Sequence, residues 1–409
     1  MTGRKRNAVV GQSGGPTAVI NNSLVGVIHE ALQHDEIGRI YGMLRGIKGV
    51  LNEDLVDLCR ESPETLGMLR DTPSSALGTV RYKVTDADYD RILEVLMAHD
   101  IGHFFYIGGN DSMDTAHKVH LLARQKGYEL QVIGVPKTID NDLAMTDHCP
   151  GYGSAARFVA TAIRGSGWDT MAMGESSPIK LMEIMGRNAG WLTAATALAR
   201  EIPEDPPQLI YVPERGVSPE KFVDDVRYWY GRLGYCVIAV SEGLRNEQGR
   251  PIGEASGTGE VDAFGHPRKA GAVEFLEGLV GESLGVKTRH DKPGYLQRSF
   301  TALVSPVDRE EAYEVGRAAV RAVIAGETDK MVTLVRQAGP EYVVDMGLAP
   351  LAEVANAEHL LPPEYLNEEG NGVTEALLDY VRPLIGGPLP PYGRLAKHAV
   401  EKHVRPWPG

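Results

Sequence analysis

Cysteine is scarce in this chain of 409 residues, and none of the patterns that usually give cysteine a structural role occurs. Only Cys59, Cys149 and Cys236 are present, an odd number far apart, with no CxxC pair and no His/Cys ligand spacing. This distribution argues against a disulfide framework and against the common zinc modules, and it suits a reducing cytosol.

Long apolar runs and long charged runs are also missing. The chain has no stretch near the roughly 18 apolar residues of a membrane-spanning helix, and its N-terminus lacks the apolar stretch of about 7 to 15 residues of a signal peptide. The formal net charge is −13, and clusters of like charge, such as RKR at 4–6 and REE at 309–311, are too short to act as tails. We therefore expect a cytoplasmic protein with neither nucleic acid nor membrane as a partner.

The chain does contain a repeated pattern of a short apolar strand, a glycine-rich or polar turn, and a helix with one apolar face. The predicted strands are NAVV, HFFYI, QVIGV, KLMEIM, QLIYV and YCVIAV, which begin at residues 7, 103, 131, 180, 208 and 235. Strands that alternate with helices in this way indicate an α/β fold with a mainly parallel sheet, in which ligands bind at the carboxyl ends of the strands.

These strands fall into two groups, which predicts two lobes with a cleft between them. We divide the chain into lobes of residues 1–150 and 151–290, with part of 290–335 joining the first. From 251 to 271 the composition turns to glycine, proline and charge, which predicts a loop. Residues 340–409, rich in proline and glutamate, are expected to form an appended helical and loop extension.

Two glycine-rich turns that follow predicted strands are candidate ligand sites. GQSGGPT at 11–17 lets backbone N–H groups approach an anion at a helix start, although a plain tight turn explains it about as well. It matches neither GxGxxG nor the phosphate loop of nucleotide-binding proteins. GGNDS at 108–112 adds an amide and a carboxylate, so Asp111 either holds Mg²⁺ through water or caps the next helix.

The turn PKTIDND at 136–142 is the strongest candidate for catalysis. If it is extended, Asp140 and Asp142 face one side together with Thr138, whereas Lys137 faces the other. A carboxylate beside phosphate-binding N–H groups can accept the proton of a hydroxyl that attacks phosphorus. An Asx-turn is the plain alternative, but this density of charge at a buried strand end favours chemistry.

Four arginines lie in or near turns, and a guanidinium is the best bidentate partner for phosphate oxygens. An arginine on an acidic protein usually forms a surface salt bridge, but four in such turns favour an anion site. They are Arg81, Arg187, Arg289 and Arg298.

The order of the motifs resembles that of the phosphofructokinases. The matching motifs, spread over roughly residues 7–340, are SGG at 13–15, YGMLRG at 41–46, LGTVRY at 77–82, GGNDS, PKTIDND, MGRNAG at 185–190, SEG at 241–243 and PGYLQRS at 293–299. The resemblance implies two doubly wound Rossmann-like lobes with mainly parallel sheets. It also implies an active-site cleft for fructose 6-phosphate and a phosphoryl donor, a step of glycolysis, Mg²⁺ as cofactor, and a homo-oligomer, either dimer or tetramer.

The same resemblance implies a role for each matching residue, with the donor in the first lobe and the sugar phosphate in the second. Asp140 is expected to be the general base for the sugar 1-hydroxyl, with Lys137 and Asp111 as further catalytic groups. Gly14, Gly109 and Arg81 are expected to bind the donor. The residues expected to bind the sugar phosphate are Thr138, Asp142, Met185, Gly186, Arg187, Glu242, Tyr295, Arg298 and Arg289, the last matching an arginine that family members lend across a subunit interface.

Three positions bear on the donor, which is ATP in one branch of the family and inorganic pyrophosphate in the other. The ATP branch reads GGDGS and PGTIDND where this chain has Asp111 and Lys137. A carboxylate at 111 would take the space and charge of a third phosphate, while Lys137 would balance the charge of pyrophosphate. With Tyr295 in place of the usual histidine, the chain resembles the reversible, pyrophosphate-dependent branch. An ATP-dependent kinase and a non-catalytic sugar-phosphate-binding regulatory subunit are the alternatives.

The chain departs from the family pattern at two positions. Asn110 replaces the aspartate linked to Mg²⁺, and its neutral amide oxygen is a weaker metal ligand, so Asp111 or water is expected to supply more of the coordination. Pro178 replaces an arginine that family members lend to a neighbouring subunit, and Lys180 is a candidate substitute.

Overall fold

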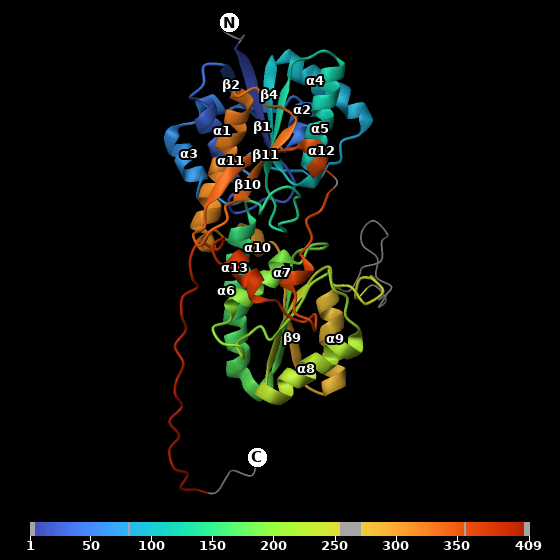
Figure 1. Cartoon of the computed structure of the whole chain (residues 1–409), viewed down its shortest axis with the longest axis vertical. Helices are drawn as coiled ribbons and strands as arrows, with labels where there is room; N and C mark the ends of the chain where they lie inside the picture. Colours follow the sequence, from blue (N-terminus) through green and yellow to red (C-terminus); the bar gives the residue numbers. More distant parts are fainter. Residues whose placement is uncertain (1–4, 81, 254–270, 356, 405–409) are drawn as a thin grey trace.

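The computed structural model describes residues 5–80, 82–253, 271–355 and 357–404, which form two lobes stacked along the long axis of the molecule (Figure 1). One lobe holds a seven-stranded sheet of order β11-β10-β5-β4-β1-β2-β3, and the other a four-stranded sheet of order β7-β8-β6-β9. The predicted α/β class, with mainly parallel sheets in two lobes, is confirmed. Arg81 and most of the predicted loop at 251–271 lie outside the described residues.

The strands of the larger sheet are parallel except for its two edge strands, β3 and β11, and the smaller sheet is parallel throughout. The bounds are β1 Arg6–Gln12, β2 Ile37–Met43, β3 Leu55–Asp57, β4 Ile101–Gly108, β5 Gln131–Pro136, β6 Ile179–Ile184, β7 Leu209–Tyr211, β8 Cys236–Ser241, β9 Thr288–Asp291, β10 Lys330–Arg336 and β11 Val344–Pro350.

Helices connect the parallel strands, and three of them begin with serine as N-cap followed by proline, a sequence that favours a helix start. The helices are α1 Ile20–Ala31, α2 Ile47–Leu51, α3 Pro63–Leu69, α4 Asp86–Ala98, α5 Asn110–Gln125, α6 Tyr152–Met173, α7 Trp191–Ala195, α8 Pro219–Leu233, α9 Ala272–Leu284, α10 Leu296–Ser299, α11 Pro306–Ile324, α12 Leu351–Val354 and α13 Glu375–Val381.

Both faces of each sheet are covered, which explains why the strands read as almost continuous apolar runs. In the larger sheet, Val10 packs with α1 and α11 on one face, whereas Val9 packs with α4 and α5 on the other (Figure 1). The pair α1 and α11 lies so close that a Cβ atom at Gly26 or Gly316 would collide with the backbone of the opposite helix. Helix α11 therefore belongs to the first lobe although it comes late in the chain.

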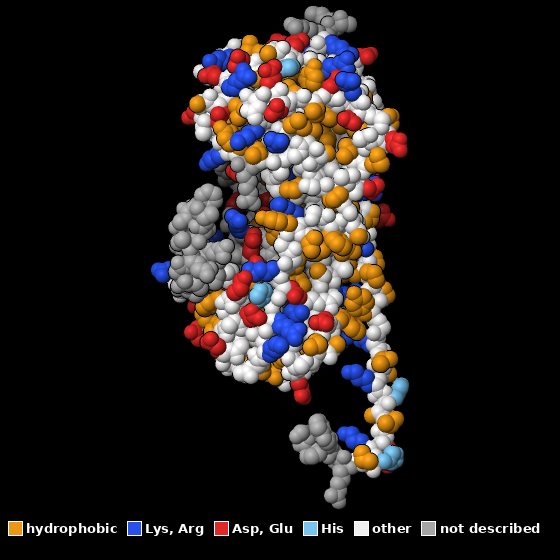
Figure 2. All heavy atoms as spheres, turned by 180° about the vertical axis from the view of Figure 1, so that it is seen from behind, with side chains coloured by type: hydrophobic (Ala, Val, Ile, Leu, Met, Phe, Trp, Pro, Cys, Tyr) orange, Lys and Arg blue, Asp and Glu red, His pale blue; other side chains and the backbone are white. Residues whose placement is uncertain are grey.

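The segment after residue 340 is built into both lobes instead of forming an appended extension. Strand β11 pairs with β10 at the edge of the larger sheet, and α13 packs into the core of the smaller lobe around Trp191. The expectation of an extension came from composition alone, which carries no information on the pairing of β11 with the preceding strand β10 or on the packing of α13 in the smaller lobe. Only from about residue 388 does the chain run extended along and beyond the smaller lobe (Figures 1 and 2).

Within the described residues, the search for a helix with the length and apolar character needed to cross a membrane finds none.

Candidate active site

A polar cavity of about 400 Å³ opens where the two lobes meet. Its walls are turns that follow β1 and β5 of the larger sheet and β6 and β8 of the smaller sheet, together with α10. Ligands in open parallel sheets bind at this end of the strands. The cavity brings together Lys137, Thr138, Asp140, Asp142, Met185, Arg187, Glu242, Tyr295 and Arg298 from among the residues singled out in the sequence.

Lys137 carries a buried ammonium group in the wall formed by the larger lobe. Its Nζ donates to the carbonyl oxygen of Gly15 at 2.8 Å, and burial lowers its pKa to about 8 despite the nearby carboxylates of Asp140 and Asp142. Gly14 has a left-handed φ of +73°, and a Cβ atom there would lie 3.2 Å from Nζ. The glycine turn after β1 is thus shaped around a cation, which suits an anionic ligand.

Asp140, from the same turn as Lys137, has a carboxyl group with a raised pKa. Burial raises its pKa to about 7, Asp142 and Glu242 add to the rise, and the cations Lys137 and Arg187 oppose it. Its Oδ1 atom is buried and has no hydrogen-bond partner among the described residues. Burial is also the main cause of the raised pKa of Asp142. A carboxylate with a pKa near 7 suits a general base at neutral pH.

The turns after β6 and β8 form the opposite wall. Gly186, with φ at +123°, donates its N–H to Glu242 Oε1 at 3.4 Å and accepts from Ser241 Oγ at 2.7 Å. Arg187 Nε lies 3.8 Å from the same Glu242 oxygen, and 79% of the arginine side chain is exposed. The Glu242 carboxylate therefore lines the cavity beside the exposed guanidinium of Arg187. This pair can bind hydroxyl groups and an anion.

Helix α10 closes one end of the cavity with an aromatic ring and a guanidinium. The Cζ atom of Arg298 lies 4.4 Å from the centre of the Tyr295 ring, and Tyr295 is 64% exposed. A Cβ atom at Gly15 would collide with Nη1 of Arg298, so the glycine turn and this arginine are close neighbours. Arg298 also contributes to the lowered pKa of Lys137.

The turn GGNDS lies beside the cavity without lining it. The N–H of Lys137 donates to the carbonyl of Gly108 at 3.1 Å, and a Cβ atom at Gly109 would lie 3.7 Å from the carbonyl oxygen of Lys137. Asp111 is exposed in the first turn of α5, whose N-terminal N–H groups favour a negative charge. Asn110 donates from Nδ2 to the carbonyl of Ala357 at 2.7 Å, which leaves its buried Oδ1 without a partner among the described residues.

Arg289 lies apart from the cavity. It is on β9, where it pairs in register with Lys180 of β6. The Nζ of Lys180 is 3.4 Å from Asp291 and 3.8 Å from Asp169, so this lysine is engaged within its own lobe and does not reach the cavity.

The comparisons with known proteins identify the family of the chain. The Phosphofructokinase family model matches residues 7–323. The chain belongs to the phosphofructokinase family. Its relatives include phosphofructokinases named pyrophosphate–fructose 6-phosphate 1-phosphotransferase, 44% identical in Methylococcus capsulatus over 98% of each chain and 43% identical in Rhodospirillum rubrum over 97% of this chain and 98% of that one. A sulfofructose kinase of Alkalicoccus urumqiensis is 37% identical over 88% of this chain and 91% of its own.

Solved structures of the family show the same fold. The pyrophosphate-dependent phosphofructokinase of Marinobacter aquaeolei superimposes with a TM-score of 0.85 at 41% identity, over 98% of each chain. The phosphofructokinase of Saccharomyces cerevisiae, at 20% identity and a TM-score of 0.67, supports the fold alone.

Several residues that line the cavity or hydrogen-bond to its lining residues were not singled out in the sequence. Gln297 is buried, and its Oε1 accepts from the N–H of Met185 at 3.1 Å, so it fixes the MGR turn of this phosphofructokinase. It stands inside the YLQRS motif, so the motif could have pointed to it. Asn188 lines the cavity and donates to Glu358 at 2.8 Å. Glu358 lies in no motif and is 170 residues from Asn188 in sequence, so no local pattern could have predicted the contact.

Proposed function

We propose that this chain transfers a phosphoryl group reversibly from inorganic pyrophosphate to the 1-hydroxyl of fructose 6-phosphate, giving fructose 1,6-bisphosphate and phosphate. The observation that carries the proposal is the meeting of a buried lysine ammonium and a carboxyl of raised pKa in one cavity. The names of relatives 42–44% identical over nearly the whole chain support the same reaction.

Each step of the proposed mechanism has a residue. The sugar lies against Glu242 and the MGR turn, with Thr138 and Asp142 beside it and its 6-phosphate toward Tyr295 and Arg298. Asp140 accepts the proton of the 1-hydroxyl as that oxygen bonds to the nearer phosphorus of pyrophosphate. The bridging P–O bond breaks and phosphate leaves, while Lys137 balances the charge that develops on the transferring group.

Pyrophosphate is favoured over ATP by charge at the donor turn. Asp111 adds a negative charge at the start of α5, beside the wall that carries Lys137. A third phosphate and a nucleoside would have to approach that carboxylate, whereas a donor of two phosphates ends before it. Gly14, Gly109 and Arg81 complete the proposed donor site.

Magnesium is the proposed cofactor. The described residues hold no cluster of three His, Cys, Asp or Glu side chains that could bind a metal by themselves. Mg²⁺ commonly uses one or two protein oxygens together with substrate phosphates and water, so the unpartnered Oδ1 of Asn110, with the carboxylate of Asp111 nearby, fits such an ion. When bound, the ion would neutralise phosphate charge.

The larger-sheet lobe is the proposed donor lobe and the smaller-sheet lobe the proposed sugar-phosphate lobe. Arg289, which lies away from the cavity of its own chain, is proposed to reach the sugar phosphate of a second copy in a homo-oligomer. A cytoplasmic location follows from small, soluble glycolytic substrates.

Phosphorus NMR of the purified protein tests the reaction in both directions. With fructose 6-phosphate, Mg²⁺ and pyrophosphate, the pyrophosphate signal should give way to equal amounts of phosphate and sugar 1-phosphate signals, and fructose 1,6-bisphosphate with phosphate should restore pyrophosphate. Turnover with ATP and none with pyrophosphate would reject the donor, and no turnover with either would favour the non-catalytic alternative. Sulfofructose serves as a second acceptor, since one relative is named for it.

A further inference from the structure

The direction of the Asp140 carboxyl depends on the backbone that carries it. Its Oδ1 has no hydrogen-bond partner among the described residues, so no neighbouring side chain holds that atom in place. The next residue, Asn141, has a left-handed φ of 57°, a backbone conformation that residues other than glycine adopt at a cost in free energy. A turn of this kind persists only where surrounding contacts fix it.

Asn141 is fixed at both ends of its buried amide. Its Oδ1 accepts from the N–H of Cys149 at 2.9 Å, and its Nδ2 donates to the Tyr380 hydroxyl at 2.9 Å. The same hydroxyl donates to the carbonyl of Asp147 at 2.7 Å. Burial raises the pKa of Tyr380 well above its ordinary value, so the hydroxyl keeps the proton that it donates.

A second contact reaches the turn from the same part of the chain. The N–H of His359 donates to the carbonyl of Asp142 at 2.8 Å. The two residues before it accept from side chains of the neighbouring turns: Ala357 from Asn110 at 2.7 Å, and Glu358 from Asn188 at 2.8 Å. One short segment thus touches the turns that follow β4, β5 and β6.

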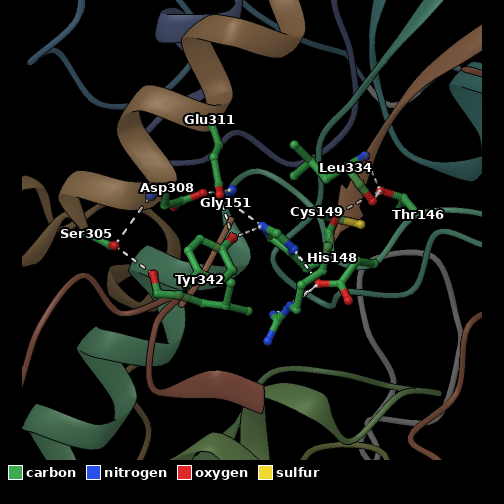
Figure 3. A network of polar contacts seen from close by, with 12 residues as sticks. Thr146, His148, Cys149, Gly151, Ser305, Asp308, Glu311, Leu334 and Tyr342 are labelled. Carbon is green, nitrogen blue, oxygen red and sulfur yellow. Dashed lines mark hydrogen bonds and ion pairs between the residues drawn. The ribbon is translucent and has the colours of Figure 1, made fainter. Parts of the chain in front are cut away.

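The loop that carries Asp140 follows β5 and ends at α6. Its last part, around His148 and Gly151, is hydrogen-bonded to α11, as Figure 3 shows. His148 lies between Asp147 and Glu311, 2.8 Å from a carboxylate oxygen of each. The N–H of Gly151 donates to Asp308 at 2.7 Å. Because this end is already anchored, the contacts from the C-terminal segment act mainly on the part that carries Asp140.

We propose that Ala357, Glu358, His359 and Tyr380 form a brace that positions the Asp140 turn, with the Tyr380 hydroxyl as its principal positioning group. The proposal rests on the role of Asp140 proposed above. All four residues lie beyond residues 7–323, the stretch that the family model matches, so the brace assigns a task to the chain that follows it.

The variant Tyr380→Phe tests the brace, because it removes one hydroxyl and keeps the ring. It should lower kcat on the order of tenfold while KM for both substrates changes little, since the base is displaced but the binding groups stay. Hydrogen–deuterium exchange of peptides within 141–151 should become faster, since Asn141 loses its acceptor and its bond to the Cys149 N–H loosens.

Tyr365→Phe is the matched control. The Tyr365 ring stacks on Tyr380 with centres 5.8 Å apart, and no hydrogen bond of its hydroxyl is present in the described part of the chain. The control should keep both kcat and exchange unchanged. If Tyr380→Phe behaves like this control in kcat and exchange, the brace is rejected.

Two further outcomes keep the test decisive. If the unaltered protein proves to have no turnover, the proposed function fails, and exchange in 141–151 alone decides the brace. If Tyr380→Phe does not fold, exchange of the Cys149 N–H is measured in the unaltered protein. Protection equal to that of the core strands supports the brace, and exchange as fast as in exposed loops overturns it.

Discussion

At the scale of single residues, the cavity keeps two oppositely charged groups in an environment that disfavours the charge of each. Burial lowers the pKa of Lys137 to about 8 and raises that of Asp140 to about 7. Each charged group would be more stable in water, so the fold gives up stability to place a carboxylate and a cation together. Perturbed titrations of this kind are typical of sites where protons are transferred.

Replacing Asp140 by Asn tests both its effect on stability and its role in turnover. Turnover with pyrophosphate should fall at least about a hundredfold, because the proton acceptor is lost. The folded-state pKa of Asp140 lies above its ordinary value of 3.8, so its charge destabilises the fold fully above about pH 7, and the cost disappears below pH 3.8. The variant should therefore unfold at a higher temperature than the unaltered protein at pH 8, measured by calorimetry. Unchanged turnover would remove Asp140 from its role.

The same two groups predict how activity depends on pH. Asp140 must be ionised and Lys137 must be charged, so kcat/KM for pyrophosphate should fall as pH drops below about 7 and again as it rises above about 8. Initial rates across pH 5 to 10, at constant ionic strength, measure the profile. A flat profile between about pH 6 and 9 would contradict the assignment.

At the scale of elements, the contact between α11 and the loop that follows β5 depends on a buried charged histidine. Hydrogen bonds to Asp147 and Glu311 raise the pKa of His148 to about 9 against the effect of burial. Its contribution to folding is complete below the ordinary pKa of 6.5 and is lost as pH rises through about 9, on the order of 3 kcal/mol.

Urea unfolding at pH 6.5 and pH 9.5 measures this contribution. The free energy of unfolding should fall between the two values in the unaltered protein, and His148→Gln should show a smaller fall, because glutamine does not titrate. An equal fall in both proteins would show that other groups carry the pH dependence.

The sequence predicted the elements whose signals are local. PKTIDND and MGRNAG each follow an apolar strand, so Asp140 and Arg187 could each be expected at the carboxyl end of a parallel sheet, where ligands bind. The two strands belong to different sheets, so their meeting in one cavity depends on how the lobes pack. Strand β11 directly follows its antiparallel partner β10 in the chain, but an expectation based on composition did not identify it. Tyr380 could not be predicted, because its partners Asn141 and Asp147 lie far away in sequence and meet it only through tertiary packing. The exposure of Asp111 on α5 and the distance of Arg289 from the cavity also depend on tertiary structure, which no motif encodes.

At the scale of the whole molecule, the C-terminal tail is attached to the smaller lobe only as far as Arg394. That residue bonds to the buried Asp205 at 2.6 Å, and Tyr392 packs edge-on against Trp168. Beyond it, Leu395, Val400 and Val404 are more than 80% exposed. As far as it is described, the tail runs past the end of the smaller lobe (Figure 2), and its residues 395–404 make no hydrogen bond or ion pair.

Shortening the chain to end at Arg394 should therefore leave the thermal midpoint of the monomer almost unchanged. The control, Arg394→Ala in the full chain, should lower stability by about 1 to 3 kcal/mol, because the buried Asp205 loses its cationic partner. Calorimetry and light scattering of each protein give stability and mass together. A large loss of stability in the shortened chain would show that residues after Arg394 pack on the body or on another copy.

The central claim is that the charge at position 111 selects the donor, and the ratio of kcat/KM for pyrophosphate to that for ATP tests it most directly. We predict a ratio far above one for the unaltered protein, and a ratio lowered by at least about tenfold in Asp111→Gly, since removing the carboxylate weakens pyrophosphate use and admits the nucleotide. Asp111→Asn keeps the shape of the side chain without its charge, so its ratio should lie between those of the unaltered protein and Asp111→Gly. A ratio that stays the same in all three proteins would contradict the account.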